Sequence, residues 1–342
     1  MWIQPDEIGE KYKEERALNS ITIELLNQCN WNCMHCYLDR KVFGLDESKI
    51  HQIIDEARQL GVYEIKLSGG EITLNPKLNQ IIEDVRNHYC RVVLLSNMYK
   101  VDDSVFDCVK EYGIDQVETT LFSHKETVHD AFVGVKGALR NTLINLLKMQ
   151  KLGVSVKVKT WAIKSNIDDL QTMQEYFFSL GFDFEVEVQI YDSLNGVMKL
   201  PDKEKLTDLE YRRALHMCDI SHHRCFPIEW NNNERLCPEF MNSLYITANG
   251  DIVPCAKFRK VLGNIYESSL IDIWNQSKLL HEIQDYTWKD CKGCESCSKK
   301  EYCVRCGAMA FIKGKSYLDN CQETCVLAAI REKKYIEGVS NY

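Results

Sequence analysis

Strand-like and helix-like segments alternate along residues 21–192, and this alternation constrains the fold more than any other feature of the chain. Short apolar runs are separated by longer stretches whose apolar residues recur at helical spacing. A helix between two strands allows them to lie parallel, so the pattern predicts βαβ units around a parallel sheet. The expected strands are 21–26, 63–67, 91–96, 116–121, 154–163 and 184–191, and the expected helices are 46–60, 77–88, 102–112, 138–152 and 168–180.

Six strands with five or six helices are too few for a closed eight-stranded barrel, so we expect an α/β fold, an open partial (β/α)6 barrel. Ligands of such sheets bind at the carboxyl ends of the strands. Beyond residue 200, the cysteines become dense and the apolar periodicity becomes too weak for an ordinary core. This change predicts a small cysteine-rich domain that is stabilised by metal. The expected parts are an N-terminal extension 1–19, the barrel 20–200, a bridging linker 201–236, the cysteine-rich iron–sulfur domain 237–325 and a C-terminal helix or tail 326–342.

Sixteen cysteines in 342 residues are the main compositional signal. The N-terminus lacks the basic and apolar regions of a signal peptide, and no apolar run approaches the roughly 18 residues of a membrane span. The net charge of −8 gives no indication of a nucleic-acid surface. We therefore expect a cytoplasmic protein without nucleic-acid or membrane partners, in which disulfides are disfavoured and cysteines bind metal.

Three of the cysteines, Cys29, Cys33 and Cys36, follow the first expected strand with the spacing C-x3-C-x2-C. They should therefore lie at the ligand-binding edge of the sheet. Three thiolates can hold three irons of a cubane cluster, whereas clusters that only carry electrons normally have four protein ligands. A vacant metal position is typical of a catalytic site. The alternatives are three unpaired cysteines, or a zinc site that lacks one ligand.

A pair of glycines follows the second expected strand, in Ser68-Gly69-Gly70-Glu71. Glycines let a backbone approach a ligand closely, and a carboxylate beside them suits an ammonium group. An ordinary strand-to-helix turn would explain the same residues. Their place one strand after the cysteine triplet favours a shared binding site.

Together, the triplet and Gly69-Gly70-Glu71 resemble the radical S-adenosylmethionine (radical SAM) superfamily over residues 20–192. The resemblance implies that the methionine amino and carboxylate groups of SAM chelate the open iron of a 4Fe–4S cluster. It also implies that the glycine motif contacts the SAM amino group. The implied reaction is reductive cleavage of SAM to a 5′-deoxyadenosyl radical, which abstracts a hydrogen atom from a substrate C–H bond.

The resemblance also assigns SAM contacts near the strand ends. His35 stands before the third cysteine, where relatives often have an aromatic residue, and Tyr37 follows that cysteine. Asn97 and Thr120 occupy positions that resemble ribose contacts, although ordinary polar residues at strand ends explain them equally well. Met98 stands where the family frequently has glycine.

The cysteines from residue 237 onward resemble the SPASM domain, an extension of some radical SAM enzymes that holds auxiliary iron–sulfur clusters. The pattern is Cys237-x12-Gly250-x4-Cys255, then Cys294-x2-Cys297-x5-Cys303-x2-Cys306, and then Cys321. Zinc is the alternative for this half, because paired C-x2-C units bind zinc readily. The resemblance implies two auxiliary 4Fe–4S clusters, the first on Cys225, Cys237, Cys255 and Cys306 and the second on Cys294, Cys297, Cys303 and Cys321.

The pattern defines some of these ligands less well than others. The first auxiliary set has three matching cysteines, and we expect Cys225 as the fourth ligand, with Cys218 as second choice. A free cysteine in this stretch would instead be able to donate a hydrogen atom to a substrate radical. Cys325 can replace Cys321, since the two are four residues apart. We expect His222-His223 to lie in a solvated loop rather than to form a ligand pair.

The leading hypothesis for function is crosslinking or epimerisation of a ribosomally made peptide, with a flavodoxin- or ferredoxin-type electron donor. It rests on the SPASM resemblance, and residues 128–137 resemble a loop of peptide-modifying members. Only 28 residues precede Cys29, so we expect peptide to bind at the barrel mouth or through a separate recognition protein. The alternatives are dehydrogenation or epimerisation of a small molecule such as an aminocyclitol or sugar, maturation of a sulfatase-like protein, and a non-enzymatic electron-transfer or zinc-scaffold protein.

Overall fold

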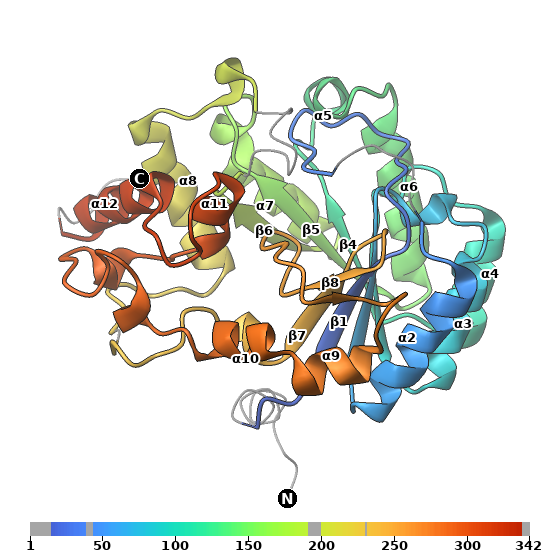
Figure 1. The fold of residues 1–342 in the computed structure, drawn as a ribbon. Coiled ribbons are helices and arrows are strands. Elements are labelled where there is room, and N and C mark those ends of the chain that lie inside the picture. The colour runs from blue at the N-terminus through green and yellow to red at the C-terminus, as the bar shows by residue number, and fades with distance from the viewer. Residues whose placement is uncertain (1–14, 39–43, 191–199, 230, 337–342) are drawn as a thin grey trace, which may run out of the picture.

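The computed structural model describes residues 15–38, 44–190, 200–229 and 231–336. In these ranges the chain forms one continuous sheet with helices around it (Figure 1). The strand order is β6-β5-β4-β3-β2-β1-β7-β8-β9, and neighbouring strands from β6 to β7 are parallel. No helix in the described ranges is long and apolar enough to cross a membrane.

The six expected strands are present, and the prediction of a partial α/β barrel is confirmed. Strands of a parallel sheet covered by helices are apolar on both faces, and β3 accordingly buries Val92, Val93 and Leu94 in succession. Tyr191, at the end of the sixth expected strand, lies outside the described residues. The strands are β1 Ser20–Glu24, β2 Glu64–Ser68, β3 Arg91–Leu95, β4 Gln116–Thr120, β5 Ser155–Trp161 and β6 Asp183–Glu187.

Amphipathic helices connect these strands where the periodicity predicts them. In α2, Ile50, Ile53, Ile54 and Ala57 are all buried, because residues at this spacing share one side of a helix. The sequence pattern does not predict α5, which occupies part of the expected loop 128–137. The helices of this part are α2 Glu47–Gln59, α3 Leu78–Asn87, α4 Asp103–Tyr112, α5 Glu126–Val133, α6 Ala138–Lys151 and α7 Leu170–Ser179.

The C-terminal region continues the barrel sheet. Strand β7 (Ser243–Ile246) pairs in parallel with β1, so that Ile21 lies opposite Leu244. Strands β8 (Asp251–Val253) and β9 (Gly263–Asn264) extend this edge as antiparallel neighbours. Leu244 belongs to the same apolar core as the barrel strands, and so does Trp274 of α9 (Leu270–Gln276). The expectation that this region lacks an ordinary core is therefore wrong for its first part.

The remaining C-terminal segments pack around a second apolar cluster. Its large buried side chains are Phe240, Phe258, Trp288 and Tyr317. Helices α10 (Lys278–Asp285) and α11 (Gly307–Ile312) contribute to it. Several of the predicted ligand cysteines pack against this cluster, namely Cys237, Cys255, Cys294, Cys303 and Cys306.

Helices α8 (Asp208–Ser221) and α12 (Gln322–Ile336) join the other edge of the sheet to the C-terminal region. Helix α8 lies in the expected linker and packs on β6, and α12 packs on α8. Asp219 of α8 and Arg331 of α12 form a buried ion pair with a shortest distance of 3.0 Å. The C-terminal region thus reaches both edges of the open barrel, β1 through β7 and β6 through α8 (Figure 1).

Candidate active site and cluster-binding regions

The carboxyl ends of the barrel strands place the predicted SAM residues at one edge of the sheet. Cys29 follows β1, Gly69 follows β2, Asn97 follows β3 and Thr120 ends β4. This is the edge at which parallel α/β sheets bind ligands. The topology therefore brings these predicted residues to a common region, and their individual contacts to SAM stay predictions.

The glycine motif is hydrogen-bonded to the start of the cysteine loop. Gly70 N donates to Leu26 O and Glu71 N donates to Gln28 O, both at 2.8 Å. A Cβ atom on Gly70 would lie 2.2 Å from Gln28 O, and one on Gly69 would lie 2.3 Å from Leu26 O. No larger residue fits at either position without moving the loops apart. The glycines therefore fix the cysteine loop against the second strand.

Glu71 directs its carboxylate into the protein. The side chain is fully buried and accepts hydrogen bonds from Ser96 Oγ at 2.6 Å, Asn97 N at 2.7 Å and Thr73 N at 3.0 Å. Burial raises the pKa of Glu71, although these hydrogen bonds oppose the shift. The carboxylate orders the chain that follows β3, and a contact of Glu71 with the SAM amino group stays a prediction.

Asn97 connects the end of β3 to the cysteine loop. Its side-chain Nδ2 donates to Asn30 Oδ1 at 2.7 Å and lies 3.9 Å from Cys29 Sγ. The next residue, Met98, is buried and has a φ of +53°, in the left-handed region that favours glycine. The family resemblance leads us to expect glycine at this position, and the left-handed backbone conformation gives a physical reason for that preference.

Helix α5 supports the cysteine loop as well, and the sequence reasoning missed it. Asn32 N donates to Val133 O at 2.8 Å, and Met34 N donates to Phe132 O at 3.2 Å. Carbonyl groups in the last turn of a helix lack intrahelical partners and are available for such contacts. Gly134 ends the helix at a φ of +70°. A glycine directly after an apolar helical stretch is the signal that would have identified α5.

His35 lies among three aromatic rings. Its ring centroid is 4.8 Å from that of Phe122, 5.1 Å from that of Trp161 and 5.6 Å from that of Phe132. Burial lowers the pKa of His35 to about 4, so the imidazole is neutral near pH 7. A neutral ring next to the third cysteine suits contact with a flat base, and contact with the SAM adenine stays the prediction for His35.

Tyr37 faces a buried polar network between the barrel and the C-terminal region. Glu24, the last residue of β1, is 2% exposed and accepts hydrogen bonds from Tyr245 Oη at 2.7 Å and Arg259 Nη2 at 2.5 Å. The Arg259 guanidinium lies 5.9 Å from the ring centroid of Tyr37. Burial and then the nearby Glu24 charge raise the pKa of Tyr37 to about 12. This location favours a structural role for Tyr37 over the predicted SAM contact.

This network joins two cysteine-bearing loops. Tyr37 directly follows Cys36, and Arg259 lies four residues after Cys255. Arg259 is held from two sides, by the Glu24 carboxylate and by the ring of Tyr245 on β7. The loop that carries Cys36 and the loop that carries Cys255 are therefore positioned relative to each other by buried side chains.

Five cysteines of the C-terminal region line one pocket. Cys321 is buried and its Sγ donates to Glu323 Oε2 at 2.8 Å, whereas Cys325 is exposed. Cys291, which the pattern leaves surplus, hydrogen-bonds Cys294 and thereby lowers the pKa of that thiol. The pocket contains the whole predicted second auxiliary set together with its predicted substitute, namely Cys294, Cys297, Cys303, Cys321 and Cys325.

The cysteines of the first auxiliary set that match the pattern gather around Tyr317. Cys237, Cys255 and Cys306 all pack on the second apolar cluster, and all three interact electrostatically with the Tyr317 hydroxyl. Cys225 has other neighbours: it is exposed, and the ring of the next residue, Phe226, packs on Tyr335 of α12 at a centroid distance of 5.5 Å. The assignment of Cys225 as the fourth ligand stays a prediction.

Cys218, the second choice for that ligand, is also engaged elsewhere. It lies in the last turn of α8, is 1% exposed, and neighbours Glu187 and His222. His222 is the C-cap residue of α8 and its side chain is 16% exposed. The expectation of a solvated histidine loop is therefore wrong for His222. Cys225 therefore stays the predicted fourth ligand of the first auxiliary set, ahead of Cys218.

Two family models match the chain. The model of the radical SAM superfamily matches residues 23–177, and the model of the SPASM iron–sulfur cluster-binding domain matches residues 237–299. The chain belongs to the radical SAM superfamily. The first matched region covers β1 to most of α7, and the second begins at Cys237.

This radical SAM enzyme is similar to several characterised proteins. The antilisterial bacteriocin subtilosin biosynthesis protein AlbA of Bacillus subtilis is 28% identical over 308 residues, which cover 86% of this chain and 67% of AlbA. The AdoMet-dependent heme synthase of Methanosarcina barkeri is 23% identical over 331 residues, with 87% and 94% coverage. The crystal structure of Streptococcus suis SuiB bound to S-adenosylmethionine has the same fold, with a TM-score of 0.70, 18% identity and coverage of 92% and 80%.

The cofactors of this radical SAM enzyme are SAM and 4Fe–4S clusters, and its cysteines fit them. Thiolates bound to one zinc ion at about 2.3 Å lie about 3.8 Å apart. Among the described residues, no three cysteine sulfurs lie within 4.8 Å of one another, although five line a single pocket. Such spread groups are compatible with a cluster of several irons.

Arg305 should tune the second auxiliary cluster. Its guanidinium lines the pocket, lies 5.2 Å from the Tyr317 ring centroid, and has a buried Nη1 without a hydrogen-bond partner. A cation beside thiolates stabilises the more negative, reduced cluster, so Arg305→Gln should lower the reduction potential and Arg305→Lys should largely preserve it. Redox titration followed by electron paramagnetic resonance would measure this. An unchanged potential in Arg305→Gln at full iron content would contradict the prediction.

Proposed function

We propose that the protein modifies a ribosomally made peptide by removing a hydrogen atom from a C–H bond, with a crosslink or an inverted stereocentre as the result. The observation that carries the proposal is the similarity to AlbA, which covers 86% of this chain. The sporulation killing factor maturation protein SkfB of Bacillus subtilis, 26% identical over 273 residues, supports it. The similar fold of SuiB, which has been solved with its precursor peptide SuiA, is compatible with it.

In this proposal, Cys29, Cys33 and Cys36 hold the SAM-binding cluster, and the other ligand cysteines hold two auxiliary clusters. The reduced SAM-binding cluster supplies the electron that cleaves SAM to methionine and a 5′-deoxyadenosyl radical. The part played by the protein is positional: Gly70, Asn97 and α5 fix the cysteine loop at the carboxyl edge of the sheet. Cys29 is exposed there, which leaves this side of the loop accessible to SAM and substrate.

The proposal includes partners and a location. A flavodoxin- or ferredoxin-type protein supplies electrons, a separate protein assists peptide recognition, and the reaction takes place in the cytoplasm.

A small molecule is the second candidate substrate. It is favoured by the similarity to the heme synthase of Methanosarcina barkeri, which covers 94% of that enzyme. Both candidates need the same SAM cleavage, so they differ only in which substrate loses a hydrogen atom to the 5′-deoxyadenosyl radical.

The test is an anaerobic assay of protein that has been reconstituted with iron and sulfide. We expect about twelve irons per chain, which corresponds to three 4Fe–4S clusters. SAM and the reductant dithionite are then added. Three kinds of substrate are compared by how much each increases the formation of 5′-deoxyadenosine: peptides encoded next to the gene, sugars, and porphyrins. Mass spectrometry then detects loss of two hydrogens for a crosslink, or deuterium uptake from heavy water for epimerisation. Stimulation by a peptide with either mass change supports the proposal. Stimulation and turnover only with a small molecule would overturn it.

A further inference from the structure

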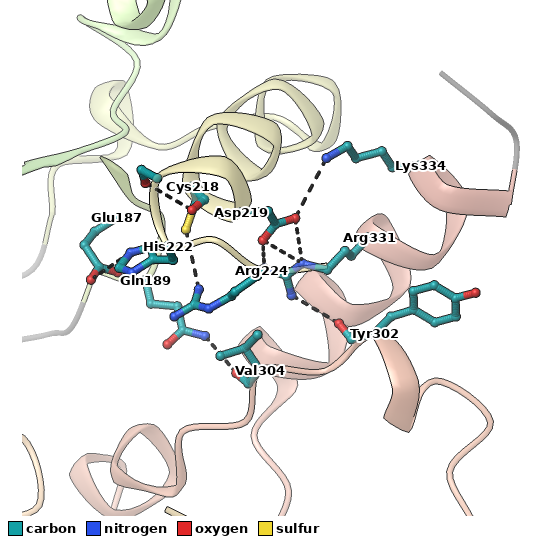
Figure 2. Close-up of polar contacts among 11 residues, drawn as sticks. Glu187, Gln189, Cys218, Asp219, His222, Arg224, Tyr302, Val304, Arg331 and Lys334 are labelled. Atoms are coloured by element: carbon teal, nitrogen blue, oxygen red, sulfur yellow. Dashed lines mark hydrogen bonds and ion pairs between the residues drawn. The ribbon is translucent and has the colours of Figure 1, made fainter. Parts of the chain in front are cut away.

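A mixed group of metal-ligating side chains lies outside all the predicted cluster sets. Glu187, Cys218 and His222 bring a carboxylate oxygen, Sγ and an imidazole nitrogen within 4.8 Å of one another (Figure 2). Among the described residues, these three form the one group of His, Cys, Asp and Glu side chains that comes this close. Glu187 ends β6, so the group lies toward the carboxyl edge of the sheet.

The backbone holds these side chains in place. Cys218 and His222 are four residues apart, one turn of α8, and His222 N donates to Cys218 O at 3.0 Å. Residues at this spacing project from the same side of a helix. Val186 N donates to Ser221 Oγ at 3.1 Å, which ties the end of α8 to β6. The group therefore does not depend on a flexible loop for its geometry.

The imidazole of His222 lies between two carboxylates without a well-aligned hydrogen bond from Nε2 to either. This buried nitrogen is 3.3 Å from Glu185 Oε1 and 3.5 Å from Glu187 Oε1. Charge-assisted hydrogen bonds are shorter, about 2.7–2.9 Å. Contacts this long around a buried polar atom are compatible with a bound ion between the ligands.

The spacing matches that of two ligands on one metal ion. Nitrogen and oxygen atoms that bind a tetrahedral zinc at about 2.1 Å lie about 3.4 Å apart. The distance from His222 Nε2 to Glu187 Oε1 is 3.5 Å. The contact is therefore long for a hydrogen bond and suitable for a pair of ligands on one ion.

The carboxylates of this region differ in their cationic neighbours, and Glu187 lies near Lys257 and Arg224 as well as His222. Asp219 is neutralised by Arg331 at 3.0 Å and Lys334 at 3.8 Å, and Lys157 pairs with Glu185 at 3.4 Å (Figure 2 shows the Asp219 contacts). Arg224 Nη1 lies 3.8 Å from Cys218 Sγ and can remain beside a metal-bound thiolate. A divalent ion would balance the Glu187 carboxylate and the Cys218 thiolate.

We propose that Glu187, Cys218 and His222 bind one divalent transition-metal ion, with zinc as the best fit. Cysteine sulfur, histidine nitrogen and glutamate oxygen each bind zinc, and three protein ligands leave a fourth position for water or a substrate donor atom. Binding exchanges the Cys218 thiol proton, released to solvent, for the metal and involves no electron transfer. The proposal is independent of the identity of the radical SAM substrate.

The experiment uses the full chain with its iron–sulfur clusters already reconstituted, so that zinc cannot fill their cysteines. After dialysis against zinc and then zinc-free buffer, elemental analysis should find about one zinc per chain, with iron unchanged. Cys218→Ala and His222→Asn should each weaken zinc affinity by more than about tenfold, since even groups that only orient ligands contribute that much. The matched control is Cys108→Ala, another buried thiol. With cobalt in place of zinc, the wild type should show a sulfur-to-cobalt charge-transfer band that Cys218→Ala lacks.

Two results would overturn the site. One is a wild-type protein that retains no zinc after dialysis. The other is equal zinc retention in the wild type, Cys218→Ala and His222→Asn. If Cys218→Ala does not fold, Glu187→Gln and His222→Asn decide the question, because both side chains are partly exposed. Production of 5′-deoxyadenosine by the same samples reports separately on the SAM-binding cluster.

Discussion

Cys29→Ala, Cys33→Ala or Cys36→Ala should each reduce 5′-deoxyadenosine formation to the background of a protein-free reaction. Each thiolate is expected to hold one iron of the SAM-binding cluster, and two thiolates do not hold a cubane stably. The cysteine loop should keep its place, because its supports are backbone hydrogen bonds to Gly70, Glu71 and α5 rather than contacts of the sulfurs. Loss of activity would therefore reflect loss of the cluster and not of the fold.

The measurement pairs 5′-deoxyadenosine, by liquid chromatography and mass spectrometry, with iron content. We expect iron to fall by about four per chain in each variant while the auxiliary clusters remain. Cys108→Ala is the matched control: Cys108 is 7% exposed on α4, its Sγ contacts Asn79 O at 3.5 Å, and it belongs to no predicted ligand set. SAM cleavage at wild-type rate in a triplet variant would show that the catalytic cluster lies elsewhere.

Much of this site is predictable because its signals are local. The strands and helices of the barrel follow from apolar periodicity, and the topology then places Cys29 and Gly69 at one edge. Helix α5 escaped prediction because it is only eight residues long, about two turns, which is too short for a clear apolar period. Its role in holding the cysteine loop depends on contacts about a hundred residues apart in sequence.

Other features depend on pairing that no local pattern encodes. β1 and β7 are separated by more than two hundred residues, and nothing in the short apolar run Ser243–Ile246 specifies β1 as its partner. The same holds for side chains with several possible partners. Cys225 is assigned as a ligand by its place in the sequence alone, which does not reveal that the next residue, Phe226, packs on Tyr335 of α12. Glu71 illustrates the point within a motif: its residue type is predictable, whereas the inward direction of its carboxylate is not.

Removal of the Arg259 guanidinium should destabilise the junction between the two cysteine-bearing regions. Arg259→Met leaves the Glu24 carboxylate buried with only Tyr245 Oη and Ala248 N as hydrogen-bond donors. Breaking a buried ion pair by removing one partner costs about 3–5 kcal/mol, which should lower the melting temperature by several degrees in a protein of this size. Differential scanning calorimetry of the anaerobic, cluster-loaded protein measures this change.

The matched control is Arg213→Met, which removes a guanidinium from an exposed ion pair with Asp168, worth about 0–1 kcal/mol. A double variant that adds Glu24→Gln to Arg259→Met should melt higher than Arg259→Met alone, because no uncompensated charge remains buried. Hydrogen exchange should increase both around Cys36 and around Cys255, since Tyr37 and Arg259 link these loops. Equal melting temperatures for Arg259→Met and Arg213→Met would mean that the β1–β7 pairing holds the junction without the ion pair.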